Sequence, residues 1–225
     1  MLSVVIPTLN AAASLAEVLA GFASRFNGNS VEVIVVDGGS CDATCAIAAS
    51  KGAQVIAAPR GRGGQLAAGA KASRGDWLLF LHADTVLSDD WRDDAAHFIA
   101  QPENAKRAAA FRLVLDDGAT AARCLEAMAA WRAKVFGLPY GDQGLLIERE
   151  FYESLGGFRP LPLMEDVDLA RRIGRSRFVH LSAEARTSAL RYRRSGFLCR
   201  SARNLTCLGL YFLGVNTRLL VRLYG

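Results

Sequence analysis

The stretch VEVIVVDGGSCDAT, residues 31–44, decides the fold class of this chain. Its first six residues form an apolar run of strand length, and a carboxylate and two glycines follow it. A second run, of helix length, begins at Thr44. A strand, a glycine-rich turn and a helix in this order predict one βα unit of a parallel sheet.

The same alternation continues on both sides of this unit. We expect further strands at residues 3–7, 54–57 and 77–81, and helices at residues 14–26, 44–51 and 64–72. In the second half, the pattern predicts strands at residues 109–115 and 145–147, helices at residues 121–135 and from Glu165 onward, and a helical tail. The predicted fold class is α/β, with a mostly parallel central sheet flanked by helices and a Rossmann-like nucleotide-binding half.

Length and composition bound the domain organisation. With 225 residues, 51% of them hydrophobic, the chain can bury one substantial core but not two. We expect one main domain, residues 1–195, and a C-terminal helical tail, residues 196–225. Residues 2–6 already read as a core strand and not as a leader, which predicts a cytoplasmic location. The five cysteines lack the spacing of zinc or redox pairs, so we expect reduced thiols.

The tail combines apolar residues with positive charge. The net charge of the chain is +5, and after Glu184 the sequence has eight arginines but no lysine, aspartate or glutamate. A helix of this kind suits the anionic inner surface of a membrane. Packing on the main domain or in a homodimer explains the same pattern equally well. Nucleic acid is not an expected partner, because no recognised motif accompanies the arginines.

Polar or glycine-rich segments follow each of the first four predicted strands. In an open α/β sheet, ligands bind beyond the carboxyl ends of the strands, so these segments form the candidate site. Asp37 can accept a hydrogen bond from a nucleotide base, and Gly38 allows a ligand to approach the backbone. The alternative is a plain turn in which Asp42 caps the next helix.

Two polar side chains end the fourth predicted strand. His82 and Asp84 are two residues apart, so the geometry of a strand points both toward one ligand. A carboxylate suits a hard divalent cation on a diphosphate, and an imidazole favours manganese. The alternative is a strand end at which Asp84 begins a turn into the next helix.

Three acidic residues crowd one predicted helix start, namely Glu165, Asp166 and Asp168. Acidic residues in a first turn ordinarily stabilise the helix dipole and do nothing more. Repulsion between close carboxylates also raises the pKa of at least one of them, and a raised pKa suits a general base. This helix start is therefore a candidate catalytic site.

Four segments occur in a fixed order along nearly the whole chain: SVVIPTLN, VVDGGSCDAT, GRGGQLAAGAKASRGDWLLFLHADT and MEDVDLARR. In this order they resemble the family 2 glycosyltransferases, especially the short bacterial members. The resemblance implies a GT-A fold, with Asp84 on a Mn2+ or Mg2+ ion and Asp166 as the catalytic base beside Glu165. The predicted nucleotide-binding residues are Pro7, Thr8, Asn10, Asp37, Gly38, Arg62 and Ala83. For Arg62, a solvated basic turn is the alternative. We expect the carboxylates at positions 37, 84 and 166 to surround one pocket.

Several positions depart from the pattern of that family. His82 stands where the family usually has the first of two metal-binding aspartates, and Ser188 replaces the glutamine of a Q-x-x-R-W motif. By this resemblance Arg191 faces the pyrophosphate or the acceptor, and Asp142 and Gln143 hold an acceptor hydroxyl. A polar turn is the alternative for the last two residues.

The resemblance thus implies an inverting, hexosyltransferase-like enzyme. It would take a sugar from a UDP- or GDP-sugar and attach it to an acceptor hydroxyl, for example on a lipid-linked acceptor at the inner membrane surface. The main alternative is a catalytically inactive protein that binds nucleotide sugars, because the first metal-binding aspartate is absent. A sugar-phosphate nucleotidyltransferase would need a glycine- and arginine-rich loop after the first strand, where this chain has PTLN at residues 7–10.

Overall fold

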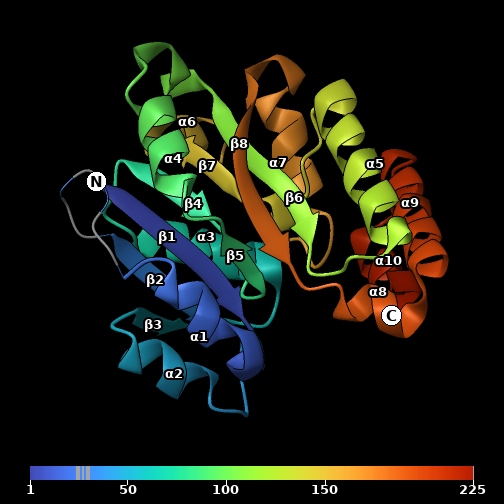
Figure 1. The fold of residues 1–225 in the computed structure, drawn as a ribbon, viewed down its shortest axis with the longest axis horizontal. Helices are drawn as coiled ribbons and strands as arrows, with labels where there is room; N and C mark the ends of the chain where they lie inside the picture. The colour runs from blue at the N-terminus through green and yellow to red at the C-terminus, as the bar shows by residue number, and fades with distance from the viewer. Residues whose placement is uncertain (24–25, 27, 29–30, 225) are drawn as a thin grey trace.

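The part of the chain that the structure describes forms an eight-stranded sheet with helices on both faces (Figure 1). The computed structural model describes residues 1–23, 26, 28 and 31–224, without the side chains of residues 191, 194 and 195. The strands lie in the order β3-β2-β1-β4-β7-β6-β8-β5.

The first half of the chain builds the parallel part of this sheet. Its strands are β1 (Leu2–Thr8), β2 (Glu32–Asp37), β3 (Gln54–Ala57) and β4 (Trp77–Phe80). They alternate with α1 (Ala12–Ala20), α2 (Thr44–Ser50) and α3 (Arg62–Ala72). Because neighbouring strands here pair in parallel, their carboxyl ends lie at one edge of the sheet, where a ligand site is expected.

The second half is mixed in direction. Its elements are β5 (Thr85–Leu87), α4 (Trp91–Ile99), η1 (Pro102–Lys106), β6 (Ala108–Leu115), α5 (Thr120–Phe136), η2 (Gly141–Gln143), β7 (Leu145–Glu148), α6 (Arg149–Ser154), α7 (Glu165–Ile173), η3 (Arg175–Arg177) and β8 (Phe178–Thr187). β7 is antiparallel to β4 and β6, β8 is parallel to β6, and β5 pairs antiparallel with β8. The predicted parallel arrangement therefore describes the first half of the sheet, and the second half adds antiparallel strands.

The core consists of two layers, one on each face of the sheet. Alternate residues of a strand point to opposite faces, so Val4 and Ile6 of β1 pack with α1, α2 and α4, whereas Val5 packs with α3 and α7. All three valine and isoleucine side chains are fully buried. Burial on both faces explains why the strands of the first half read as continuous apolar runs.

The tail comprises α9 (Phe197–Phe212) and α10 (Thr217–Tyr224), and α8 (Leu190–Ser195) precedes it. All three helices lie beside α5 at one end of the molecule (Figure 1). Cys207 and Leu220 are fully buried in the second core layer, so the inner side of the tail packs on the main domain. On its outer side, Leu198 is 87% and Leu213 is 81% exposed. In the described residues, no helix combines the length and the apolar character that crossing a membrane requires.

Candidate active site

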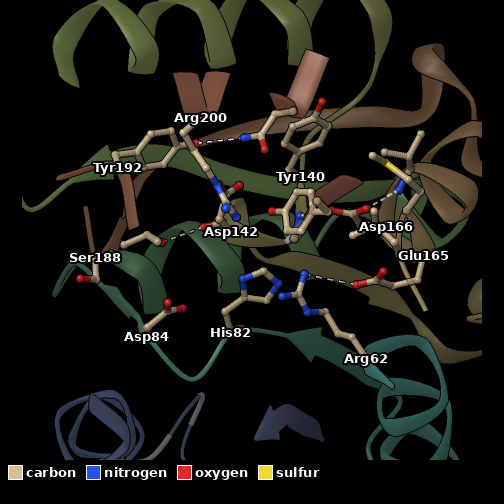
Figure 2. A pocket seen from close by; sticks show the side chains of 17 residues that line it. Arg62, His82, Asp84, Tyr140, Asp142, Glu165, Asp166, Ser188, Tyr192 and Arg200 are labelled. Carbon is tan, nitrogen blue, oxygen red and sulfur yellow. Dashed lines mark hydrogen bonds and ion pairs between the residues drawn. The ribbon is translucent and has the colours of Figure 1, made fainter. Parts of the chain in front are cut away.

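Two adjoining hollows open at the carboxyl edge of the parallel strands. The acidic pocket is lined by side chains from both halves of the chain, among them Arg62, His82, Asp84, Asp142, Glu165 and Asp166 (Figure 2). The outer cleft is lined by the ends of β1 and α3, among other segments, with Pro7, Thr8, Asn10, Arg62, His82, Ala83 and Asp84. Three of these residues line both hollows, so a ligand can extend from one into the other.

Asp37 ends β2 and turns its carboxylate toward its own chain. It accepts hydrogen bonds from the backbone N–H groups of Gly39 and Ser40, at 2.9 and 2.8 Å, and from the hydroxyl of Thr8 at 3.1 Å. Burial acts to raise the pKa of Asp37, but the hydrogen bonds from Ser40, Gly39 and Thr8 outweigh it and hold the pKa below its usual range. Asp37 and Gly38 do not line the outer cleft; Asp37 instead fixes Thr8, which does.

Gln65 of α3 is a lining residue of the outer cleft that the sequence motifs did not single out. Its buried amide donates to the backbone carbonyls of Thr8 and Val36, at 2.9 and 2.8 Å. A Cβ atom on Gly38 would lie 3.1 Å from the amide nitrogen of Gln65, so the glycine allows this close approach. The side chain therefore joins α3 to the ends of β1 and β2.

Asn10 lines the outer cleft in a left-handed backbone conformation, with φ of 52°. Its backbone N–H donates to the hydroxyl of Ser40 at 2.8 Å, and its side-chain oxygen accepts from the N–H of Cys41 at 2.9 Å. Asparagine tolerates this conformation better than most residues. Asn10 therefore ties the loop after β1 to the loop after β2.

His82 and Asp84, in the loop after β4, both line the acidic pocket (Figure 2). A Cβ atom on Gly141 would lie 2.5 Å from Nε2 of His82, so only glycine leaves room for the imidazole. Among the described residues, no group of three or more His, Cys, Asp and Glu side chains could hold a metal ion. A carboxylate is a ligand that both Mg2+ and Mn2+ accept, and an imidazole is a ligand that suits Mn2+ better than Mg2+.

Glu165 and Asp166 begin α7, after Met164 in a left-handed conformation with φ of 65°. Glu165 is 2% exposed, and its Oε1 lies 3.4 Å from Nη1 of Arg62. Burial and the neighbouring Asp166 raise the pKa of Glu165, and Arg62 opposes this rise. Of the acidic residues at this helix start, Glu165 therefore has the raised pKa that the sequence led us to expect.

Asp166 directs its carboxylate into the acidic pocket (Figure 2). Its Oδ2 accepts from the N–H of Gly141 at 2.8 Å, and its Oδ1 accepts from the N–H of Val167 at 2.8 Å. Two backbone donors from separate elements fix the orientation of the carboxylate. Asp84 and Asp166, far apart in the chain, thus share one pocket, and Asp37 lies outside it.

Asp142 and Gln143 lie in η2 but face different surroundings. Asp142 lines the acidic pocket, and its buried Oδ1 accepts no hydrogen bond from the described residues. Burial, together with Asp166 and Asp84, raises the pKa of Asp142 to about 6. Gln143 is buried and does not line the pocket; its amide donates to the carbonyl of Phe111 at 3.2 Å and accepts from the N–H of Tyr140 at 3.3 Å.

The tail contributes a wall of the acidic pocket that the sequence motifs did not reveal. Its lining side chains are Arg200, which Figure 2 labels, Asn204 and Tyr224. Ser188 and Tyr192, which precede the tail, line the pocket as well (Figure 2). The side chain of Arg191, in α8, lies outside the described residues. The apolar spacing of the tail indicates a helix, and this signal alone could have suggested that Arg200 and Asn204, four residues apart, share a face.

The fold is similar to those of two solved glycosyltransferase structures. One is glucosyl-3-phosphoglycerate synthase from Mycobacterium tuberculosis, with a TM-score of 0.61, 23% identity, and 84% of this chain and 70% of that chain covered. The other is residues 1–349 of S. aureus TarS, with a TM-score of 0.65, 16% identity, and 99% of this chain and 69% of that chain covered. At this level of identity the likeness shows the fold, which is of the GT-A type.

Sequence comparison gives the family. A protein of Rickettsia bellii (strain RML369-C), described as an uncharacterized glycosyltransferase, is 38% identical over 85 residues, which span 37% of this chain and 29% of that protein. The family model described as "Glycosyl transferase family 2" matches residues 3–141, the segment that carries both β1 and the His82–Asp84 loop. The chain belongs to glycosyl transferase family 2.

Proposed function

We propose that this protein transfers a sugar from a nucleotide diphosphate sugar to an acceptor hydroxyl, with inversion at the anomeric carbon. The observation that carries the proposal is the shared pocket of Asp84 and Asp166, which joins a candidate diphosphate site to a candidate base. Membership of glycosyl transferase family 2 supports the reaction class.

The outer cleft is the proposed donor site. Pro7, Thr8, Asn10 and Ala83 line it, and Asp37 and Gly38 support its floor through Thr8 and Gln65. Arg62 and Asp84 stand where the cleft meets the acidic pocket, so a nucleotide in the cleft would bring its diphosphate to them. Solved structures of similar fold contain UDP with Mn2+ or Mg2+, or UDP-GlcNAc, which supports a UDP-sugar as the first donor to test.

Asp84, with His82, is the proposed holder of the divalent cation. When bound, such an ion neutralises the charge that develops on the leaving diphosphate. Arg62 supplies a fixed positive charge at the same place, and Glu165 at 3.4 Å holds its guanidinium there. We assign Glu165 to this positioning role in the catalytic site.

Asp166 is the proposed base. It takes the proton of the acceptor hydroxyl as that oxygen forms a bond to the anomeric carbon, and the bond from this carbon to the diphosphate oxygen breaks. The nucleoside diphosphate leaves on the opposite face of the sugar, so one displacement inverts the configuration. The N–H groups of Gly141 and Val167 keep the carboxylate in one orientation for this transfer.

Residues 1–195 are the proposed catalytic domain, and the tail, residues 196–225, is proposed to close its pocket and to meet a membrane. Exposed leucines, including Leu198 and Leu213, accompany exposed arginines at positions 203, 218 and 222. Apolar and positive groups on one surface complement the anionic inner leaflet of a membrane. A lipid-linked acceptor would be reached from there.

The second candidate function is nucleotide-sugar binding without catalysis, favoured by His82 in place of an aspartate at the cation site. A screen of UDP- and GDP-sugars by melting temperature, with and without Mn2+, tests both functions, since a ligand of the folded state raises the melting temperature. We expect one donor to raise it, more so with Mn2+, and to release nucleoside diphosphate slowly by hydrolysis. Binding without release would favour the second candidate, and no binding of any donor would contradict both.

A further inference from the structure

Arg200, on α9, is a buried cation in the tail wall of the acidic pocket. It is only 8% exposed, and its side chain reaches into the pocket (Figure 2). The guanidinium carbon lies 4.4 Å from the centre of the Tyr224 ring, which is a cation–π contact. Such a contact does not require a hydrogen bond from the N–H donors of the guanidinium, so they can serve other partners.

Arg200 shares the acidic pocket with several carboxylates. No carboxylate of the described residues forms an ion pair with it, whereas Arg62, in the same pocket, is paired with Glu165. Removing a charged group from water is unfavourable unless an opposite charge or hydrogen bonds replace the water. A buried arginine at the wall of an open pocket therefore suits an anionic ligand.

Asn204 lies one helical turn after Arg200 and lines the same pocket. Its Nδ2 donates to the hydroxyl of Tyr192 at 3.4 Å. Its buried Oδ1 accepts no hydrogen bond from the described residues. A buried carbonyl oxygen without a donor is unfavourable, and a hydroxyl group of a ligand would satisfy it.

The position of these two side chains separates them from the proposed donor site. Arg200 and Asn204 line the acidic pocket but not the outer cleft, whereas Arg62 and Asp84 line both. Asp166 lines the acidic pocket too, so the tail wall and the proposed base face one space. That space is where an acceptor has to lie for its hydroxyl to meet Asp166.

We infer that the acceptor is an anionic hydroxyl compound, with a phosphate or carboxylate group bound by Arg200 and a hydroxyl group that donates to Asn204. The inference rests on the proposed function, because it assigns the acceptor side of that site. A planar guanidinium matches both phosphate and carboxylate with two parallel hydrogen bonds. The tail thereby selects the acceptor as well as covering the pocket.

Titration calorimetry with inorganic phosphate tests the inference on the full chain, saturated beforehand with Mg2+ and with UDP or GDP, whichever binds. We expect the wild-type protein to bind phosphate saturably and Arg200→Met to bind it at least about tenfold more weakly, as the loss of a charge-assisted hydrogen bond predicts. Arg200→Lys keeps the charge but loses the paired donors, so its affinity should fall between the two. Arg218→Met removes an exposed arginine outside the pocket and should bind phosphate as the wild type does.

Equal phosphate affinity in the wild type and Arg200→Met, or no saturable binding to the wild type, would overturn the inference. The nucleotide titration, done before the phosphate titration, distinguishes failure of this inference from failure of the proposed function. Absence of nucleotide binding would contradict the proposed function itself. Melting temperatures of all variants show whether each one folds. If Arg200→Met does not fold, the phosphate affinity of Arg200→Lys is the test. An affinity equal to that of the wild type would overturn the proposed pairing of a planar guanidinium with the anion.

Discussion

Glu165 and Asp166 are neighbours in the sequence, yet their surroundings differ. Glu165 is buried in the pocket wall against Arg62, whereas Asp166 is only half-buried in the same pocket and is held by the N–H of Gly141. A helix turns by about 100° per residue, so adjacent side chains at its start face different directions. This divergence supports the proposed roles, positioning for the buried carboxylate and proton transfer for the accessible one.

Asp142 provides a test of the electrostatics of the pocket. Its pKa is raised to about 6, so the folded protein binds the proton more tightly than the unfolded chain does. Ionisation of Asp142 therefore lowers the free energy of unfolding as the pH rises from the ordinary aspartate range through about 6. We expect Asp142→Asn to melt at a higher temperature than the wild type at about pH 8, and the difference to shrink toward about pH 4. A difference that does not change with pH would contradict this.

Asp84 provides a test of the cation site. Asp84→Ala removes the carboxylate that faces the proposed diphosphate position, so added Mn2+ or Mg2+ should no longer raise the melting temperature of the nucleotide complex. Asp89→Ala, an exposed aspartate beyond β5, is the matched control and should respond to the ions as the wild type does. An unchanged response in Asp84→Ala would remove this residue from cation binding.

The motifs predicted some residues that line the acidic pocket and missed others for a physical reason. Asp84 and Asp166 follow recognisable segments, and the structure brings them together as expected. Asp37 was expected in the same pocket, but a carboxylate followed by Gly39 and Ser40 binds the N–H groups of its own turn. Arg200 belongs to no motif, and its role depends on how the tail packs, which local sequence does not determine.

At the scale of elements, the contact of α3 with β1 positions both hollows. Gly69 lies where the helix crosses the strand, and a Cβ atom there would lie 2.3 Å from Cγ1 of Val5 and 2.9 Å from Cγ2 of Val36. The missing side chain lets α3 approach the sheet, so Gln65 reaches Thr8 and Arg62 reaches Glu165. Gly69 therefore serves the packing of α3 on the sheet.

Two glycines of α3 allow a matched comparison. Gly69→Ala should lower the free energy of unfolding by about 1–3 kcal/mol, because the new methyl group overpacks the contact with Val5. Gly64→Ala adds a methyl group with no atom within 4 Å, and its higher helix propensity should raise the free energy of unfolding by about 0.5–1 kcal/mol. Urea unfolding of both variants measures the two changes. Equal changes in the free energy of unfolding would show that the packing of α3 on β1 does not depend on glycine at position 69.

The order of the elements could be predicted better than their ends. The predicted strand at residues 54–57 coincides with β3, and the alternation of the first half is confirmed. The first helix is predicted to reach residue 26 but ends at Ala20, and Phe22 and Phe26, beyond its end, both pack on Trp91. The short strand β5 was not predicted, because three residues are too few to show the alternation of apolar and polar residues that marks a strand.

At the scale of the whole molecule, the tail has two different faces. Its inner side supplies Arg200 and Tyr224 to the acidic pocket and Leu220 to the core, and its outer side exposes leucines and arginines. The sequence predicted the amphipathic pattern but left open which surface the inner side covers. The structure resolves this point, because Leu220 packs in the same core layer as α3 and α7.

The outer side of the tail predicts binding to anionic vesicles. We expect the full chain to float with liposomes that contain phosphatidylglycerol and not with neutral ones, because both leucines and arginines contribute. The double variant Leu198→Ser and Leu213→Ser should float less, since it removes two highly exposed apolar side chains without touching the pocket. Failure of the wild type to float, or a dimer that the double variant abolishes, would contradict a membrane contact and favour pairing of two chains.

The most direct test of the central claim is the turnover of Asp166→Asn with the donor that binds best. Nucleoside diphosphate release should fall by about a hundred- to ten-thousand-fold, because base catalysis is lost. The affinity for the nucleotide should stay unchanged, since Asp166 does not line the outer cleft. Turnover near that of the wild type in this variant would show that the proton goes elsewhere and would contradict the account.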